Sequence, residues 1–91
     1  MNKKWYYIVL YSFDPEHRVA GPFHDEKTCV DAMMAEAKQE HAIDIENGRD
    51  SYLYTHDDIG EAEILVYHDD DDDITEITEF IAFKINSDKG V

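Results

Sequence analysis

The chain has 91 residues, enough for one hydrophobic core but not for two. An apolar fraction of 43% argues against wholesale disorder, although the net charge is −14. The single cysteine, Cys29, excludes an intramolecular disulfide and a cysteine-based zinc site, and no run approaches the roughly 20 apolar residues of a membrane span. We therefore expect one soluble, cytoplasmic domain over residues 1–85, followed by a flexible tail over 86–91.

The acidic charge is unevenly distributed along the chain. Residues 1–43 contain seven acids and five bases, whereas residues 44–79 contain 14 acids and only Arg49. Self-repulsion on this scale opposes compaction. The excess serves either solubility alone or a function that uses the negative field.

Two strands are predicted before the first helix. Residues 4–13 are rich in aromatic and β-branched side chains, with Trp5, Tyr7, Val9, Tyr11 and Phe13 on one face and Tyr6, Ile8 and Leu10 on the other. A strand that is apolar on both faces is typical of a central position, or of one covered by a partner. Residues 14–17 have the pattern of a type I turn, and residues 18–23 would return as a second strand.

Residues 25–47 predict one long amphipathic helix, around which the other elements would pack. At about 100° per residue, one apolar stripe contains Val30, Met33, Met34, Ala37, His41 and Ile45. Asp25 is the expected N-cap, and Asn47 with Gly48 supplies the C-terminal stop. Cys29 falls off this stripe.

The remainder of the chain predicts further strands. A short extended segment is expected over 51–55, a loop over 56–60, an alternating strand over 61–67, a charged hairpin tip over 69–73 and a last strand over 74–85. The fold class that follows is α+β: a two-layer sandwich with one long helix on an antiparallel sheet of three or four strands, in ββαββ order.

The histidines, glycines and acids form no recognisable catalytic or metal-binding motif. The five histidines have no zinc-ligand spacing, and the four glycines are isolated rather than gathered in a phosphate-binding loop. Cys29 lacks a base placed by any recognisable pattern. A calcium loop starting at Asp69 would have Ile74 where glycine is required and Phe80 where glutamate is required. We therefore expect no enzyme activity, no cofactor and no specific metal site.

Alternating carboxylates point instead toward a protein partner. Glu61 and Glu63 would stand about 6.6–6.8 Å apart along a strand, and neighbouring acids would extend this row. Direct nucleic-acid binding is disfavoured because eight Lys and Arg face 22 acids. The predicted partner-binding residues are Asp57, Asp58, Glu61, Glu63, Tyr67, Asp69, Asp70, Asp71, Asp72, Asp73, Glu76 and Glu79. Tyr52 and Tyr54 are further candidate anchors, with Tyr67.

A small, strongly acidic chain of this kind resembles the DNA-mimic inhibitors of phages and mobile elements in charge and size. The resemblance implies a non-enzymatic module that engages a basic protein surface, such as that of a nuclease or another nucleic-acid-binding protein. One alternative is a structural homodimer joined through Trp5, Tyr7 and Tyr11, with acidity serving solubility. Another is a weak divalent-cation binder that uses the tip from Asp69 to Asp73.

Overall fold

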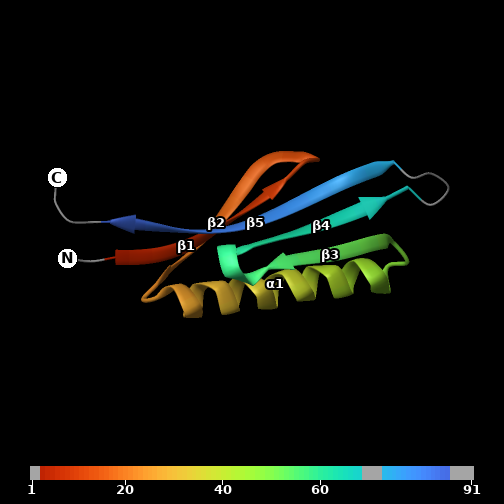
Figure 1. The fold of residues 1–91 in the computed structure, drawn as a ribbon. Coiled ribbons are helices and arrows are strands. Elements are labelled where there is room, and N and C mark those ends of the chain that lie inside the picture. Colours follow the sequence, from red (N-terminus) through yellow and green to blue (C-terminus); the bar gives the residue numbers. More distant parts are fainter. Residues whose placement is uncertain (1–2, 69–72, 87–91) are drawn as a thin grey trace.

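The computed structural model describes residues 3–68 and 73–86. Its elements are β1 (Lys3–Tyr11), β2 (Asp14–Phe23), α1 (Glu26–Glu46), β3 (Asp50–His56), a 3₁₀ turn η1 (Asp57–Ile59), β4 (Glu61–Tyr67) and β5 (Ile74–Asn86). The strands form one antiparallel sheet in the order β2-β1-β5-β4-β3, and α1 lies across one face of it (Figure 1). The α+β class is confirmed. The expected strand count of three or four is wrong. The short segment after the helix, β3, pairs along its whole length with β4, and the sheet has five strands.

The helix is fixed at both ends by the residues predicted to cap it. The side chain of Asp25 accepts a hydrogen bond from the backbone N–H of Thr28 at 2.7 Å. Hydrogen bonding from Thr28 lowers the pKa of Asp25, so the cap stays charged. Asn47 forms the C-cap, and Gly48 follows with a φ of 75°, which glycine adopts at no steric cost.

The buried face of α1 is rotated relative to the predicted stripe. Met33, Met34 and Ala37 are buried as expected. Cys29, expected off the stripe, is also fully buried, whereas Ile45 is 53% exposed. In the last turns the side chains that reach the sheet are polar, as in the hydrogen bond between His41 and Ser51. Ile45, one turn later, lies beyond these contacts and is exposed.

The core lies between α1 and the inward side chains of the sheet. Alternation along β4 places Ala62, Ile64 and Val66 in the core, and Phe80 of β5 is fully buried beside them. Polar bonds close the rim, where Glu36 of α1 accepts a hydrogen bond from the hydroxyl of Tyr7 and pairs with Arg18. The helix is therefore tied to β1 and β2 as well as packed on the central strands.

The first hairpin turns earlier than predicted. Ser12 and Phe13 form the turn, and β2 already begins at Asp14. Ser12 is held against β5, since its N–H donates to the carbonyl of Ile77 at 2.9 Å and its Oγ accepts from the N–H of Ile77 at 2.8 Å. The expected turn at 14–17 is instead an irregularity near Pro15, where the register shifts, as an edge strand tolerates.

The connection between β3 and β4 is a tight 3₁₀ turn rather than an open loop. Gly60 ends it with a φ of 65°, and its carbonyl accepts a hydrogen bond from the N–H of Ala82 at 2.8 Å. A Cβ at Gly60 would lie 3.1 Å from the Cβ of Ala82. Glycine therefore serves both the left-handed conformation and the close approach to β5.

Shortening a side chain on the buried face of α1 should cost far more stability than shortening one on its exposed face. We expect Met33→Ala to lower the free energy of unfolding by about 2–5 kcal/mol, because it leaves a cavity in the core. Ile45→Ala is the control and should change it by less than about 0.5 kcal/mol. Urea denaturation measures both, and equal losses would contradict this packing.

Candidate functional site

The face of the sheet opposite α1 carries many apolar side chains, and no helix of the described residues lies on it (Figure 1). We call it the open face. Its residues follow from strand alternation, and most are only half-buried. Its apolar members are Tyr6, Ile8, Leu10, Val19, Tyr52, Tyr54, Leu65, Tyr67, Ile77, Ile81 and Phe83. Large exposed apolar patches on a soluble domain mark interaction sites, so this face is the first candidate.

Aromatic contacts order parts of the open face. Tyr6 stacks on Phe83 with ring centroids 5.8 Å apart, and Tyr52 meets Tyr67 edge to face at 5.5 Å. A hydrogen bond with Asp50 raises the pKa of Tyr52, so its phenol stays protonated. The face therefore presents aromatic rings in contact with one another, and the hydroxyl of Tyr52 among them is neutral.

A pair of glutamates interrupts this apolar surface near its middle. Glu63 of β4 lies directly opposite Glu79 of β5, and Glu61 lies opposite Ile81 one step along the ladder on the same face. Directly opposed carboxylates repel one another and destabilise a sheet. Within residues 3–68 and 73–86, no Lys or Arg side chain forms an ion pair with any of the three glutamates.

The predicted acidic row is divided by the fold rather than gathered into one wall. Glu61, Glu63, Tyr67 and Glu79 share the open face. Asp57 and Asp58 lie on η1, where with Glu26, Lys27, Val30 and Asp31 they line a hollow beside the start of α1. Asp73 is exposed just before β5, and Asp69, Asp70, Asp71 and Asp72 lie outside the described residues. The expectation of one continuous row along the hairpin is therefore wrong for the described acids.

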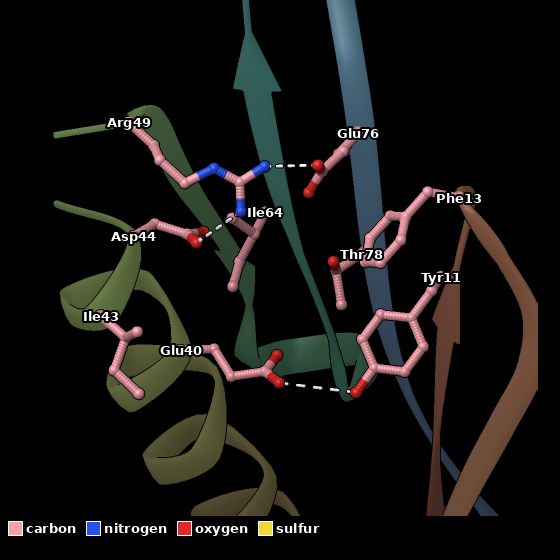
Figure 2. A pocket seen from close by; sticks show the side chains of 9 residues that line it. All are labelled: Tyr11, Phe13, Glu40, Ile43, Asp44, Arg49, Ile64, Glu76 and Thr78. Carbon is pink, nitrogen blue, oxygen red and sulfur yellow. Dashed lines mark hydrogen bonds and ion pairs between the residues drawn. The ribbon is translucent and has the colours of Figure 1, made fainter. Parts of the chain in front are cut away.

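Glu76 points away from the open face, toward the helix layer, where it meets a cation. The guanidinium of Arg49 pairs with Glu76 on one side and with Asp44 at 3.1 Å on the other (Figure 2). The hydrogen bond with Glu76, and to a smaller degree the contact with Asp44, raises the pKa of Arg49. Arg49, the only Lys or Arg within residues 44–79, thus neutralises Glu76. Glu76 is therefore not available to a partner. Sequence spacing did not reveal this pair, which joins a loop to a strand 27 positions later.

The aromatic face of β1 that we considered for a homodimer lies under α1. Tyr7 is only 5% exposed, and Trp5 and Tyr11 pack against the core cluster. Two copies therefore cannot meet through these three side chains while the helix is in place. The other face of the same strand, with Tyr6, Ile8 and Leu10, belongs to the open face.

The groove between the end of α1 and the sheet has a volume of about 170 Å³ (Figure 2). Besides Arg49 and its two carboxylates, its lining residues are Tyr11, Phe13, Glu40, Ile43, Ile64 and Thr78. Burial raises the pKa of Glu40, which accepts a long hydrogen bond of 3.5 Å from the hydroxyl of Tyr11. Three carboxylates against one guanidinium leave this small groove negative, so it favours a cation over an anion.

Asp44, which lines this groove, also belongs to a cluster with a histidine and a serine. The hydroxyl of Ser51 donates to Asp44 at 3.2 Å and lies 3.0 Å from Nδ1 of His41. A nucleophilic triad needs the histidine between the two, so that it can take the serine proton. Here the buried serine lies between the histidine and the aspartate, and its hydroxyl donates a hydrogen bond to the carboxylate. The arrangement fastens β3 to α1 and does not activate Ser51 as a nucleophile.

The remaining chemical candidates are buried or dispersed. Burial raises the pKa of the fully buried Cys29 thiol, which makes it a poor nucleophile. In the ranges 3–68 and 73–86, no three His, Cys, Asp or Glu side chains are grouped so as to hold a metal ion. The cation-binding alternative rests on the tip at Asp69–Asp73, most of which lies outside these ranges. No helix among the described residues is long and apolar enough to cross a bilayer.

Comparisons with family models, with curated proteins and with solved structures each give no match for this chain.

Replacing Arg49 should destabilise the protein more than replacing a surface lysine. Arg49→Met leaves Asp44 and Glu76 facing each other without a cation, and we expect a loss of about 1–2 kcal/mol, moderated by the partial exposure of this site. Lys27→Met is the control, because Lys27 pairs with Asp31 at a fully solvated position. Unfolding in urea, which leaves ionic strength unchanged, measures both. Equal losses for the two variants would show that the Arg49 bridge stabilises the fold no more than a surface ion pair does.

Removing the charge of Glu40 should stabilise the protein at neutral pH. Its raised pKa means that the folded chain binds more protons than the unfolded chain above pH 4.5, so its contribution to stability falls as pH rises through that window. Glu40→Gln should therefore melt higher than the parent at pH 7, with the difference shrinking as the pH approaches 4.5. Glu16→Gln, at an exposed site, controls for the change in net charge. A pH-independent difference would contradict this assignment.

Proposed function

We propose that this protein is a non-enzymatic binding module whose open face covers a basic, partly apolar surface on another protein. The observation that carries the proposal is the Glu63–Glu79 pair, which is set among half-buried apolar side chains and has no Lys or Arg ion-pair partner within residues 3–68 and 73–86. This combination of apolar area and uncompensated charge costs stability in the free protein. A partner that brings Lys or Arg to the pair removes the repulsion and covers the apolar surface in one step.

Several features of the open face suit such a complex. Tyr52, Tyr54 and Tyr67 offer contact area with hydroxyl groups at low entropic cost. The net charge of −14 attracts a basic partner over distance and speeds its association. The same charge disfavours direct contact with nucleic acid.

A narrower form of the proposal is a DNA-mimic inhibitor, in which the partner normally holds nucleic acid. In that form, side chains that bind phosphates would meet Glu61, Glu63 and Glu79. The apolar residues between these carboxylates favour the broader form, since a duplex offers no such surface in its backbone. Competition with duplex DNA separates the two forms.

The test compares capture of proteins from a lysate of the source organism by matched variants. Glu63→Gln/Glu79→Gln removes two charges from the open face, and Glu16→Gln/Glu46→Gln removes two charges elsewhere. We expect the parent and the second variant to retain a basic protein that the first loses. Raising the salt from about 50 to 200 mM should release it, because screening weakens the attraction.

The proposal fails if both double variants retain the same proteins as the parent, or if capture does not respond to salt. Once a partner is identified, titration calorimetry with added duplex DNA tests the narrower form. Displacement of the partner by DNA supports a DNA mimic, and undisturbed binding confines the function to protein recognition.

A further inference from the structure

We propose that β3 is a self-association edge: two copies of this chain pair their β3 strands antiparallel about a two-fold axis at Leu53 and form one continuous ten-stranded sheet. This inference is independent of the function proposed above. It starts from the sheet order, which leaves β2 and β3 as the two outer strands. An outer strand presents unpaired N–H and C=O groups that can bind another strand.

The two edges are not equally able to do so. The β2 edge contains Pro15 and Pro22, which lack an N–H, and its register with β1 shifts twice. Tyr6 also leans over Gly21 at this edge, where an added Cβ would lie 2.7 Å from its ring. Irregularity and proline are the usual means by which a sheet protects an edge.

The β3 edge has none of these protections. All seven of its residues pair one for one with β4 without a shift, and the strand contains no Pro, Gly or Lys. Tyr52, Tyr54, Thr55 and His56 are exposed. Among the described residues, the backbone hydrogen bonds outside the regular ladders and helices involve no residue of β3. The strand is therefore regular, and within the described part of the chain no backbone group pairs with its outer side.

The sequence of β3 is chemically symmetric about Leu53. In an antiparallel pair centred there, Asp50 lies opposite His56 of the second copy, Ser51 opposite Thr55, and Tyr52 opposite Tyr54. The pairs are a carboxylate with an imidazole, two hydroxyl groups, and two aromatic rings, each of which favours cross-strand contact. A shift of the centre by one residue leaves only five paired positions. Centred on Tyr52, the pair sets Tyr52 opposite its own copy and Tyr54 opposite Asp50. Centred on Tyr54, it sets Tyr54 opposite its own copy and Tyr52 opposite His56.

The second layer permits this approach. Such an axis stands perpendicular to the sheet, so both helices lie on the same side of the joined sheet. Beside this edge is a hollow of about 390 Å³, lined by Asp31, Met34, Ala35, Lys38, Thr55 and Asp57. Ala42 and the exposed Ile45 continue that helical stripe at i, i+3 and i+4 spacing. The helix thus offers Ala35, Lys38, Ala42 and the exposed Ile45 on the side where its counterpart would lie.

The salt dependence of the dimer should be opposite to that of the proposed partner complex. Two copies of −14 repel each other, and salt screens that repulsion. Self-association through β3 should therefore strengthen as salt rises. Binding of a basic protein to the open face should weaken.

The experiment is sedimentation velocity of the full chain over about a hundred-fold range of concentration, at low and high salt. We expect a monomer–dimer equilibrium that shifts toward dimer in high salt. Tyr54→Lys places a charge on the β3 edge and should raise the dissociation constant at least about tenfold. Val19→Lys is the matched control on the β2 edge, where Val19 is 51% exposed against 45% for Tyr54, and it should leave the constant unchanged.

A charge exchange tests the register itself. Asp50→Lys sets a lysine opposite His56 of the second copy and should weaken the dimer, although it reduces the net negative charge. Asp50→Lys/His56→Glu restores opposite charges and should recover it. Circular dichroism melts verify that each variant is folded. The proposal is overturned if the parent remains monomeric under all conditions, if Tyr54→Lys and Val19→Lys act alike, or if the exchange gives no recovery.

Discussion

One helix covers one face of a five-stranded sheet, and most of the molecule's properties follow from this constraint. Met33, Ala37 and Phe80 form a core on the covered side, where apolar side chains interdigitate without exposure. The opposite face keeps its aromatic and aliphatic residues half-buried because nothing in the described chain lies on it. A domain of this size has too little chain to add a third layer over that face. The open face is therefore a consequence of the architecture, and its composition gives it a use.

The sequence predicted the elements better than their relations. The cap at Asp25 and the bounds of α1 and β4 came from local chemistry, which acts within a few residues and survives folding. The two faces of β1 and the alternation of β4 were also correct. Which face would be covered did not follow, because β1 is apolar on both sides and periodicity alone cannot choose between them.

Errors arose where tertiary contacts outweighed local signals. The turn moved from 14–17 to Ser12 because β5 supplies two hydrogen bonds there. The predicted apolar stripe extended one turn too far, because the buried contacts of the helix run from Cys29 to Ala37 and do not reach Ile45. The acidic row was dispersed because Glu76, three residues before Glu79, faces the other layer and finds Arg49. A sequence count of charge carries no such direction. The three glutamates that remain on the open face are a smaller feature than the predicted row, but they lie among apolar side chains that a partner can cover.

The central claim is that the open face is exposed in the free monomer while the opposite face is not. Methyl NMR with a soluble gadolinium chelate measures this directly, because relaxation enhancement reports how closely solvent approaches each group. In dilute protein, the methyl signals of Ile8 and Ile81 should broaden strongly, whereas those of Val9 and Ile64 should remain sharp. Equal protection of the two sets would contradict the account, since it would mean that both faces of the sheet are covered.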